Sequence, residues 1–213
     1  MNRFKLVVFD LDGTLTPAKS IWEHIHRVLG TWENYAEDFQ RLFLDGSISY
    51  QEFCERDAMV WKGMSLSDLR RVTDSVPYQR GARQLTAYLR GKGLKLAVIS
   101  SGLSILTRRI EEELRLDFAV ANDLLQERGI LTGKVRVNVP HNGKGYWMKK
   151  LMGRLEVRRD ETMAIGDSQG DLDMFAFSGF RVAFNSSSTA LDEAADAVVE
   201  TADMADIIPR LPL

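Results

Sequence analysis

Two acidic residues near the start of the chain are spaced so that their carboxylates can act together. Asp10 and Asp12 lie in the segment Asp10 to Thr14, directly after the apolar run Leu6 to Phe9. Side chains two positions apart point the same way along an extended chain, so the two carboxylates should lie together and favour a cation or divided protonation. Gly13 allows a sharp turn that presents backbone N–H groups to a phosphate. A plain turn would not need the first acid, so the segment predicts a site for phosphate and a metal ion.

Six later residues could complete that site. They stand at the ends of apolar runs or at the starts of expected helices: Ser100, Ser101, Gly102, Lys144, Asp167 and Asp171. A helix start offers free N–H groups to a phosphate, and a lysine there opposes the helix dipole unless an anion lies nearby. Each feature alone also has a structural explanation, since serine and aspartate commonly cap helices. Their shared placement at strand ends and helix starts favours phosphate chemistry.

An alternation of strands and helices would bring these residues to one edge of a sheet. Apolar runs typical of buried strands occur at residues 6–9, 95–99, 162–165, 181–184 and 197–199. Helical patterns occur at residues 81–89, 103–114, 145–155, 172–177 and 189–195, and residues 123–126 and 130–135 should form a β-hairpin around residues 128–129. This order predicts an α/β fold with a mainly parallel sheet, which binds ligands at the carboxyl ends of its strands.

The segment from residue 17 to residue 76 breaks the alternation, because it holds helical patterns and no convincing strand. One set of apolar residues follows helical spacing and should mainly form the core of this segment: Trp32, Tyr35, Phe39, Leu42 and Phe43. Ser65 is a plausible cap for a helix over residues 66–72. We therefore expect an α/β core made of residues 1–16 and 77–213, with residues 17–76 inserted after the first strand as a helical cap.

The composition of the chain narrows its partners. The 213 residues are 45% hydrophobic and carry a net charge of −2, whereas nucleic-acid binders usually have a basic excess. No apolar stretch approaches the roughly 20 residues that span a bilayer. Cys54 is the only cysteine, so no disulfide can form within the chain. The expectation is a cytoplasmic monomer or homodimer that acts on a small phosphorylated metabolite, with no nucleic-acid or membrane partner.

Taken together, the segment Asp10 to Thr14, Ser100, Lys144 and the pair Asp167 and Asp171 resemble the four motifs of the haloacid dehalogenase superfamily. The helical segment is similar to the cap of its phosphoserine phosphatase branch. The resemblance implies a three-layer Rossmann-like core and a Mg²⁺-dependent hydrolase of phosphate monoesters. The second acid, Asp12, favours a phosphatase over a dehalogenase. There are two alternatives. One is a sugar-phosphate phosphomutase, and the other is a non-catalytic regulatory module that binds phosphate.

The resemblance also implies a role for each motif residue. Asp10 would be the nucleophile and form an aspartyl-phosphate, and Asp12 would be the general acid and base. The Asp10 carboxylate, the Asp12 carbonyl group and Asp167 would hold Mg²⁺. Lys144 would be catalytic and would bind the phosphate. Three residues at the end of the second core strand would bind the phosphate with it: Ser100, Ser101 and Gly102. Asp171 would support Lys144 or a metal-bound water from behind.

The same resemblance singles out three residues for substrate choice. Lys19 stands where the phosphoserine phosphatase branch carries a glutamate that reads the amino group of its substrate. Glu55, with Arg56 next to it, stands close to the position where that branch carries the arginine that binds the carboxylate of its substrate. A cation in place of an anion disfavours a substrate that bears an ammonium group. Phosphoserine is therefore one candidate substrate among small phosphorylated metabolites.

Overall fold

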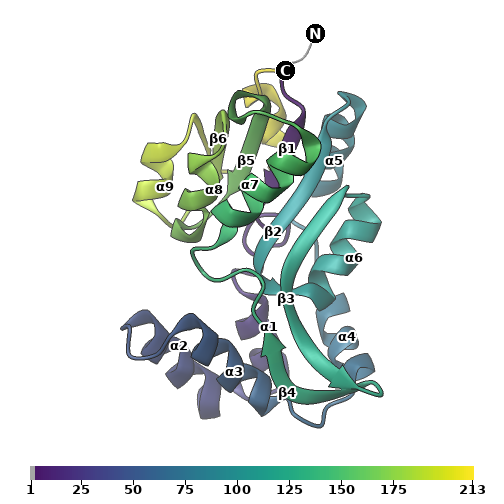
Figure 1. The fold of residues 1–213 in the computed structure, drawn as a ribbon, viewed down its shortest axis with the longest axis vertical. Coiled ribbons are helices and arrows are strands. Elements are labelled where there is room, and N and C mark those ends of the chain that lie inside the picture. The colour runs from purple at the N-terminus through teal and green to yellow at the C-terminus, as the bar shows by residue number, and fades with distance from the viewer. Residues whose placement is uncertain (1–2) are drawn as a thin grey trace.

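The fold is a seven-stranded α/β sheet with a helical insertion, seen in a computed structural model that describes residues 3–213 (Figure 1). The strand order is β4-β3-β2-β1-β5-β6-β7. The strands are β1 (Leu6–Phe9), β2 (Lys95–Leu103), β3 (Phe118–Glu127), β4 (Ile130–Arg136), β5 (Thr162–Gly166), β6 (Phe180–Phe184) and β7 (Ala197–Val199). Every described pairing is parallel except that of β3 with β4. The predicted mainly parallel sheet is confirmed.

Strand β3 is longer than the sequence predicted. Its first residues pair in parallel with β2, with Ala97 opposite Phe118, and its last residues form the predicted antiparallel hairpin with β4. Residues Phe118 to Val120 are only half-buried. They form too short an apolar run to stand out from the preceding helix, so only the hairpin half was predicted. The same strand therefore belongs to the sheet at its start and to the hairpin at its end.

Helices cover both faces of the sheet, so the core has three layers (Figure 1). The first face packs against α5 (Ala82–Gly91), α6 (Ser104–Leu114) and the 3-10 helix η4 (Met204–Arg210). The second face packs against α7 (Lys144–Leu155), α8 (Leu172–Ala176) and α9 (Thr189–Ala194). Alternate residues of β1 are divided between the two faces, because Val7 and Phe9 belong to the first core and Leu6 and Val8 to the second.

The insertion after β1 is helical, as predicted. It contains α1 (Ile21–Val28), the π-helical turn η1 (Trp32–Ala36), α2 (Glu37–Leu44), α3 (Tyr50–Val60) and α4 (Leu66–Asp74). The predicted cap Ser65 accepts a hydrogen bond from the backbone N–H of Asp68. The apolar stripe crosses from η1 into α2, and Tyr35 is 52% exposed. The expectation that Tyr35 would lie in the core of the insertion is wrong, because the π-helical turn rotates it to the outside.

Backbone hydrogen bonds join the insertion to the β3–β4 hairpin. The Leu131 N–H donates to the Met64 carbonyl at 2.9 Å, and the Leu66 N–H donates to the Gly129 carbonyl at 2.8 Å. At its far end, the guanidinium group of Arg109 in α6 donates to the carbonyls of Thr73, Asp74 and Val76. The insertion is thus held over the carboxyl edge of the sheet from two sides. Its treatment as a separate cap over residues 17–76 stays a prediction.

Within residues 3–213, no helix combines the length and the apolar character that crossing a membrane would require.

Candidate active site

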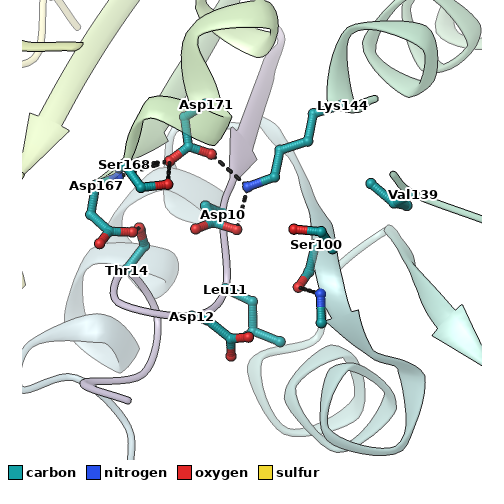
Figure 2. A network of polar contacts seen from close by, with 12 residues as sticks. Asp10, Leu11, Asp12, Thr14, Ser100, Val139, Lys144, Asp167, Ser168 and Asp171 are labelled. Carbon is teal, nitrogen blue, oxygen red and sulfur yellow. Dashed lines mark hydrogen bonds and ion pairs between the residues drawn. The ribbon is translucent and has the colours of Figure 1, made fainter. Parts of the chain in front are cut away.

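The motif residues converge because their strands are neighbours in the sheet. Strands β2 and β5 flank β1, so Ser100 within β2, Asp10 after β1 and Asp167 after β5 reach the same edge. Parallel strands end together at their carboxyl termini, and the loops there are free to carry side chains. Figure 2 shows these side chains around Lys144, which comes from the start of α7. The structure therefore gathers the residues that the sequence placed at strand ends.

Lys144 lies at the centre of the site and joins two acids. Its Nζ is 2.6 Å from Asp10 Oδ1 and 2.5 Å from Asp171 Oδ1, and all three side chains are buried (Figure 2). Burial lowers the pKa of Lys144, but the charges and hydrogen bonds of Asp10 and Asp171 together raise it by more, so the pKa lies above its usual value. Lys144 is therefore a fixed ammonium group at the bottom of the site. The two acids explain why a lysine stands at a helix start.

Asp171 has no freedom to move within this group. Its Oδ1 is held by Lys144, and its Oδ2 accepts hydrogen bonds from the backbone N–H groups of Asp167 and Ser168, each at 3.0 Å. The Ser168 hydroxyl adds a third donor at 3.3 Å. Asp171 thus caps the turn after β5 and orients Lys144 at the same time. The sequence allowed Asp171 to be a helix cap or a support for Lys144, and its contacts are compatible with both. Its role in the reaction stays a prediction.

The two acids of the first motif are buried but differ in their contacts. Burial raises the pKa of Asp10, and the charge of Asp171 raises it further against the opposing effect of Lys144. Burial raises the pKa of Asp12 to about 7, although a hydrogen bond from the Ile21 N–H opposes this rise. The other oxygen of Asp12, Oδ1, is buried and has no hydrogen-bond partner among residues 3–213. Asp12 therefore has an oxygen left for a ligand.

Three buried aspartates form a group that could hold a metal ion. Carboxylate oxygens of Asp10, Asp167 and Asp171 lie within 4.8 Å of one another. An all-oxygen donor set of this kind suits a hard divalent cation such as Mg²⁺. Asp171 has both oxygens engaged by Lys144 and by backbone N–H groups, and Asp167 has both engaged by Thr14 and Lys19. A metal ion at Asp167 would therefore have to displace one of these contacts. Burial raises the pKa of Asp167, which a cation would offset.

Lys19 reaches this acidic group from the start of the insertion. Its Nζ is 2.6 Å from Asp167 Oδ2 and 3.2 Å from the Asn185 carbonyl, while about half of its side chain is exposed. Thr14 donates to the other Asp167 oxygen at 3.2 Å. The sequence predicted that Lys19 would contact the substrate. The structure adds a contact with a candidate metal ligand.

The turn at the end of β2 forms the opposite wall of the site. The Ser100 hydroxyl is buried and accepts a hydrogen bond from the Gly102 N–H at 2.9 Å (Figure 2). A Cβ atom on Gly102 would lie 2.7 Å from Asp12 Oδ2 and 3.0 Å from Ser100 Oγ, so any larger residue would disturb both groups. The Ser101 carbonyl accepts from Trp22 Nε1, Asn122 Nδ2 and the Tyr50 hydroxyl. This turn is therefore held rigidly in place from both the core and the insertion.

The site opens into a cavity of about 190 Å³ between the core and the insertion. The cavity is lined by Asp10, Asp12, Lys19, Ser100, Ser101, Gly102 and Lys144, together with residues that the sequence did not single out for the site: Ser20, Trp22, Glu23, Gln40, Leu44, Tyr50, Phe53, His141, Ser168 and Gly170. Trp32 and Phe43 also line it. These two rings were expected mainly to form the core of the insertion, and they also line the cavity. Helical spacing marks an apolar face without saying what that face covers.

Two of the residues predicted for substrate choice lie elsewhere. Glu55 accepts a hydrogen bond from Gln51 at 2.7 Å, and Arg56 donates to Glu52 at 2.6 Å. Neither is among the described residues that line the cavity. Their proposed roles in substrate choice stay predictions.

A larger groove, about 680 Å³, lies between α4, α6 and β3. It contains none of the predicted site residues and none of the three clustered aspartates. Size alone does not mark a reactive site, so the smaller cavity over Asp10 is the candidate active site.

Comparisons with known proteins agree with this geometry. A model of the haloacid dehalogenase-like hydrolase family matches residues 7–176. The phosphoserine phosphatase of Methanocaldococcus jannaschii is 29% identical over 205 residues, which cover 96% of each chain. That of Wolinella succinogenes is 30% identical over 211 residues, covering 97% of this chain and all of the relative. A solved structure described as a phospho-aspartyl intermediate analogue of phosphoserine phosphatase matches with a TM-score of 0.85 at 28% identity, covering 98% of this chain and 99% of that one.

Proposed function

The chain belongs to the haloacid dehalogenase-like hydrolase family and is a phosphatase, and from this premise we propose that it hydrolyses a small phosphate monoester through an aspartyl-phosphate on Asp10. The observation that carries the proposal is the buried arrangement of Asp10, Lys144 and Asp171, with Asp12 beside it. One ammonium group there holds a carboxylate in place at the bottom of a small cavity. Phosphoryl transfer depends mainly on such positioning and on charge stabilisation.

Asp10 is the nucleophile of the proposed reaction. A carboxylate oxygen of Asp10 attacks phosphorus, and the bond from phosphorus to the ester oxygen breaks. Lys144 keeps the carboxylate oriented through its contact with Oδ1 and balances part of the negative charge of the phosphate. In the second half-reaction, water attacks phosphorus, the bond to Asp10 breaks, and inorganic phosphate is released.

Asp12 moves the protons of both half-reactions. It is two residues from Asp10, lines the cavity, and has one buried oxygen without a partner among residues 3–213. We assign this carboxyl group the protonation of the leaving alkoxide and then the removal of a proton from the attacking water. The Ile21 N–H holds the other oxygen at 3.1 Å and so fixes the direction of the group.

The donor set supports Mg²⁺ as the cofactor. Asp10 and Asp167 would hold the ion with the carbonyl group of Asp12, and the ion would supply positive charge to the phosphate oxygens. Asp171 would keep its present role of orienting Lys144. Ser100, Ser101 and Gly102, with Lys144, would bind the remaining phosphate oxygens at the carboxyl end of β2.

The size of the cavity supports a small substrate. Its 190 Å³ is below the roughly 300–1,000 Å³ of sites for drug-sized ligands. The relatives of this chain are named phosphoserine phosphatases, so phosphoserine is the first compound to test among small phosphorylated metabolites. The expectations of a cytoplasmic location and of a monomer or homodimer stay predictions.

The test is phosphate release from a generic aryl phosphate and from a panel of phosphorylated metabolites with Mg²⁺ present. The Asp10→Asn variant should lose at least about a thousandfold in kcat, since the nucleophile is removed. Trapping of a phosphorylated protein by acid quench should succeed with the unmodified chain and fail with the variant. Full activity in Asp10→Asn would remove the nucleophile assignment. Transfer to an added sugar phosphate in preference to water would instead indicate a phosphomutase.

A further inference from the structure

The cavity has a polar floor and an aromatic roof. The floor consists of the reactive groups Asp10, Asp12, Ser100 and Lys144. The roof comes from the insertion, and five of its side chains are aromatic: Trp22, Trp32, Phe43, Tyr50 and Phe53. A bound phosphate on the floor would therefore direct its organic group toward aromatic rings.

Phe43 lies in contact with two other rings of the roof. Its ring centroid lies 5.3 Å from that of Phe53 and 5.5 Å from that of Tyr50. It also meets the imidazole of His141, a core residue, edge to face at 5.3 Å. Centroid distances in this range are typical of favourable aromatic pairs. The roof is thus packed against the core on its own account and offers ring surface to the cavity.

Two polar groups of the roof, those of Trp22 and Tyr50, are directed elsewhere. Trp22 Nε1 and the Tyr50 hydroxyl both donate to the Ser101 carbonyl, at 3.2 and 2.5 Å. Neither donor is therefore free for the organic group of a substrate. A hydroxyl-rich or amino-bearing group placed here would lose its hydration without gaining partners from these two residues.

Charged side chains of the cavity outside the reactive group are already paired. Lys19 contacts Asp167 at 2.6 Å, and Glu23 accepts from Arg27 at 2.7 Å. A zwitterionic substrate needs one anionic and one cationic partner in addition to the phosphate site. Recruiting Glu23 as the partner of an ammonium group would break its existing pair with Arg27.

Resting on the proposed function, we infer that the preferred substrate is the phosphate monoester of a small uncharged alcohol with an apolar, planar organic group. The ring lies under Phe43 and between the flanking aromatic side chains. The phosphate binds to Lys144 and to the carboxyl end of β2. The observations favour this class over amino-acid and polyol phosphates.

The experiment compares kcat/KM for benzyl phosphate, phosphoserine and glycerol 2-phosphate with Mg²⁺ present. We expect benzyl phosphate to exceed each of the other two by about 10-fold or more, which is the discrimination that a small apolar contact provides. Phe43→Ala should lower kcat/KM for benzyl phosphate by about 10-fold and change the value for glycerol 2-phosphate by less than about threefold. The matched control is Phe39→Ala on the same helix, because Phe39 packs beside Arg56 and is not among the described residues lining the cavity.

Two results would overturn the inference and leave the phosphatase intact. One is a higher kcat/KM for phosphoserine than for benzyl phosphate. The other is an equal loss for all three substrates in Phe43→Ala. If that variant does not fold by circular dichroism, Phe43→Leu serves instead, with the same expected ranking and a smaller loss. Absence of phosphate release from every substrate, with Asp10→Asn no different from the unmodified chain, would overturn the proposed function as well.

Discussion

At the scale of single residues, the site depends on a buried ammonium group shared by two carboxylates. A buried charge is tolerated only when it is paired and hydrogen-bonded, and Lys144 meets that condition through Asp10 and Asp171. Removal of Lys144 would leave two buried carboxylates without a compensating charge. The same residues therefore serve stability and, as proposed, catalysis.

Lys144→Met should abolish phosphate release and lower the free energy of unfolding by about 3–5 kcal/mol, the usual cost of breaking a buried ion pair. The measurements are urea denaturation and the aryl phosphate assay. Lys134→Met, which changes an exposed lysine of β4, is the matched control and should do neither. A Lys144→Met variant with unchanged stability would contradict the account of the buried pairs.

Lys19 offers a second test at this scale, because its ammonium group occupies one oxygen of Asp167. Lys19→Ala should bind Mg²⁺ about 3- to 10-fold more tightly, which corresponds to at most about 1.4 kcal/mol and is of the order of an exposed ion pair. Isothermal titration with Mg²⁺ alone measures this. Lys5→Ala is the matched control, since Lys5 is equally exposed and pairs at 2.6 Å with Glu161, away from the site. Weaker binding in Lys19→Ala would show that Lys19 does not compete with the ion.

At the scale of elements, the site depends on contacts between segments that are distant in the sequence but adjacent in the fold. Backbone hydrogen bonds join the insertion to the β3–β4 hairpin, and Tyr50 and Trp22 join it to the carboxyl end of β2. The edge strands need similar ties. Asp196, just before β7, accepts hydrogen bonds from the backbone N–H, Nε and Nη2 of Arg181 in β6.

This tie predicts a pH-dependent contribution to stability. The hydrogen bonds from Arg181 hold the pKa of Asp196 below its usual value of about 3.9. A lowered folded-state pKa adds stability that is present above the unfolded-state pKa and is lost as the pH falls through the folded-state value. Asp196→Asn should therefore cost about 1 kcal/mol at pH 7, and this difference should shrink as the pH falls through the lowered folded-state pKa of Asp196. Urea denaturation over a series of pH values from 7 into the acid range measures it, and a difference that does not shrink in acid would contradict it.

At the scale of the whole molecule, the acidic group links distant parts of the chain. Asp10, Asp167 and Asp171 belong to two segments about 150 residues apart and become neighbours only through the pairing of β1 with β5. Burial raises the pKa of Asp10 and of Asp167, so a bound cation would relieve a cost that the folded chain carries. Metal binding should therefore stabilise the fold as a whole.

Mg²⁺ should raise the midpoint of thermal unfolding, since an ion at 100 times its dissociation constant adds about 2.7 kcal/mol to the folded state. Chelation with EDTA should reverse the shift. Differential scanning calorimetry of the unmodified chain and of Asp167→Asn, with and without Mg²⁺, tests this without an activity assay. An equal shift in both proteins would place the stabilising ion somewhere else.

The α/β order and the positions of the motif residues could be read from the sequence, because both depend on local patterns. Apolar runs marked β1, β2, β5, β6 and β7, and parallel strands carry reactive side chains at their carboxyl ends. Asp10, Ser100 and Asp167 follow directly from that rule. The roles of these residues stay predictions, but their convergence needed no tertiary information beyond the pairing of neighbouring strands.

Tertiary structure decided the features that depend on what a side chain faces. Helical spacing identified Phe43 and Trp32 as apolar, but only the docking of the insertion placed them over the reactive group. The contact of Lys19 with Asp167 spans 148 positions and has no local signature. Periodicity reports which face of an element is apolar and is silent about whether that face meets a core or a cavity. For this reason the sequence was sufficient to predict which polar residues meet in the site. Only the structure showed that aromatic side chains of the insertion cover them.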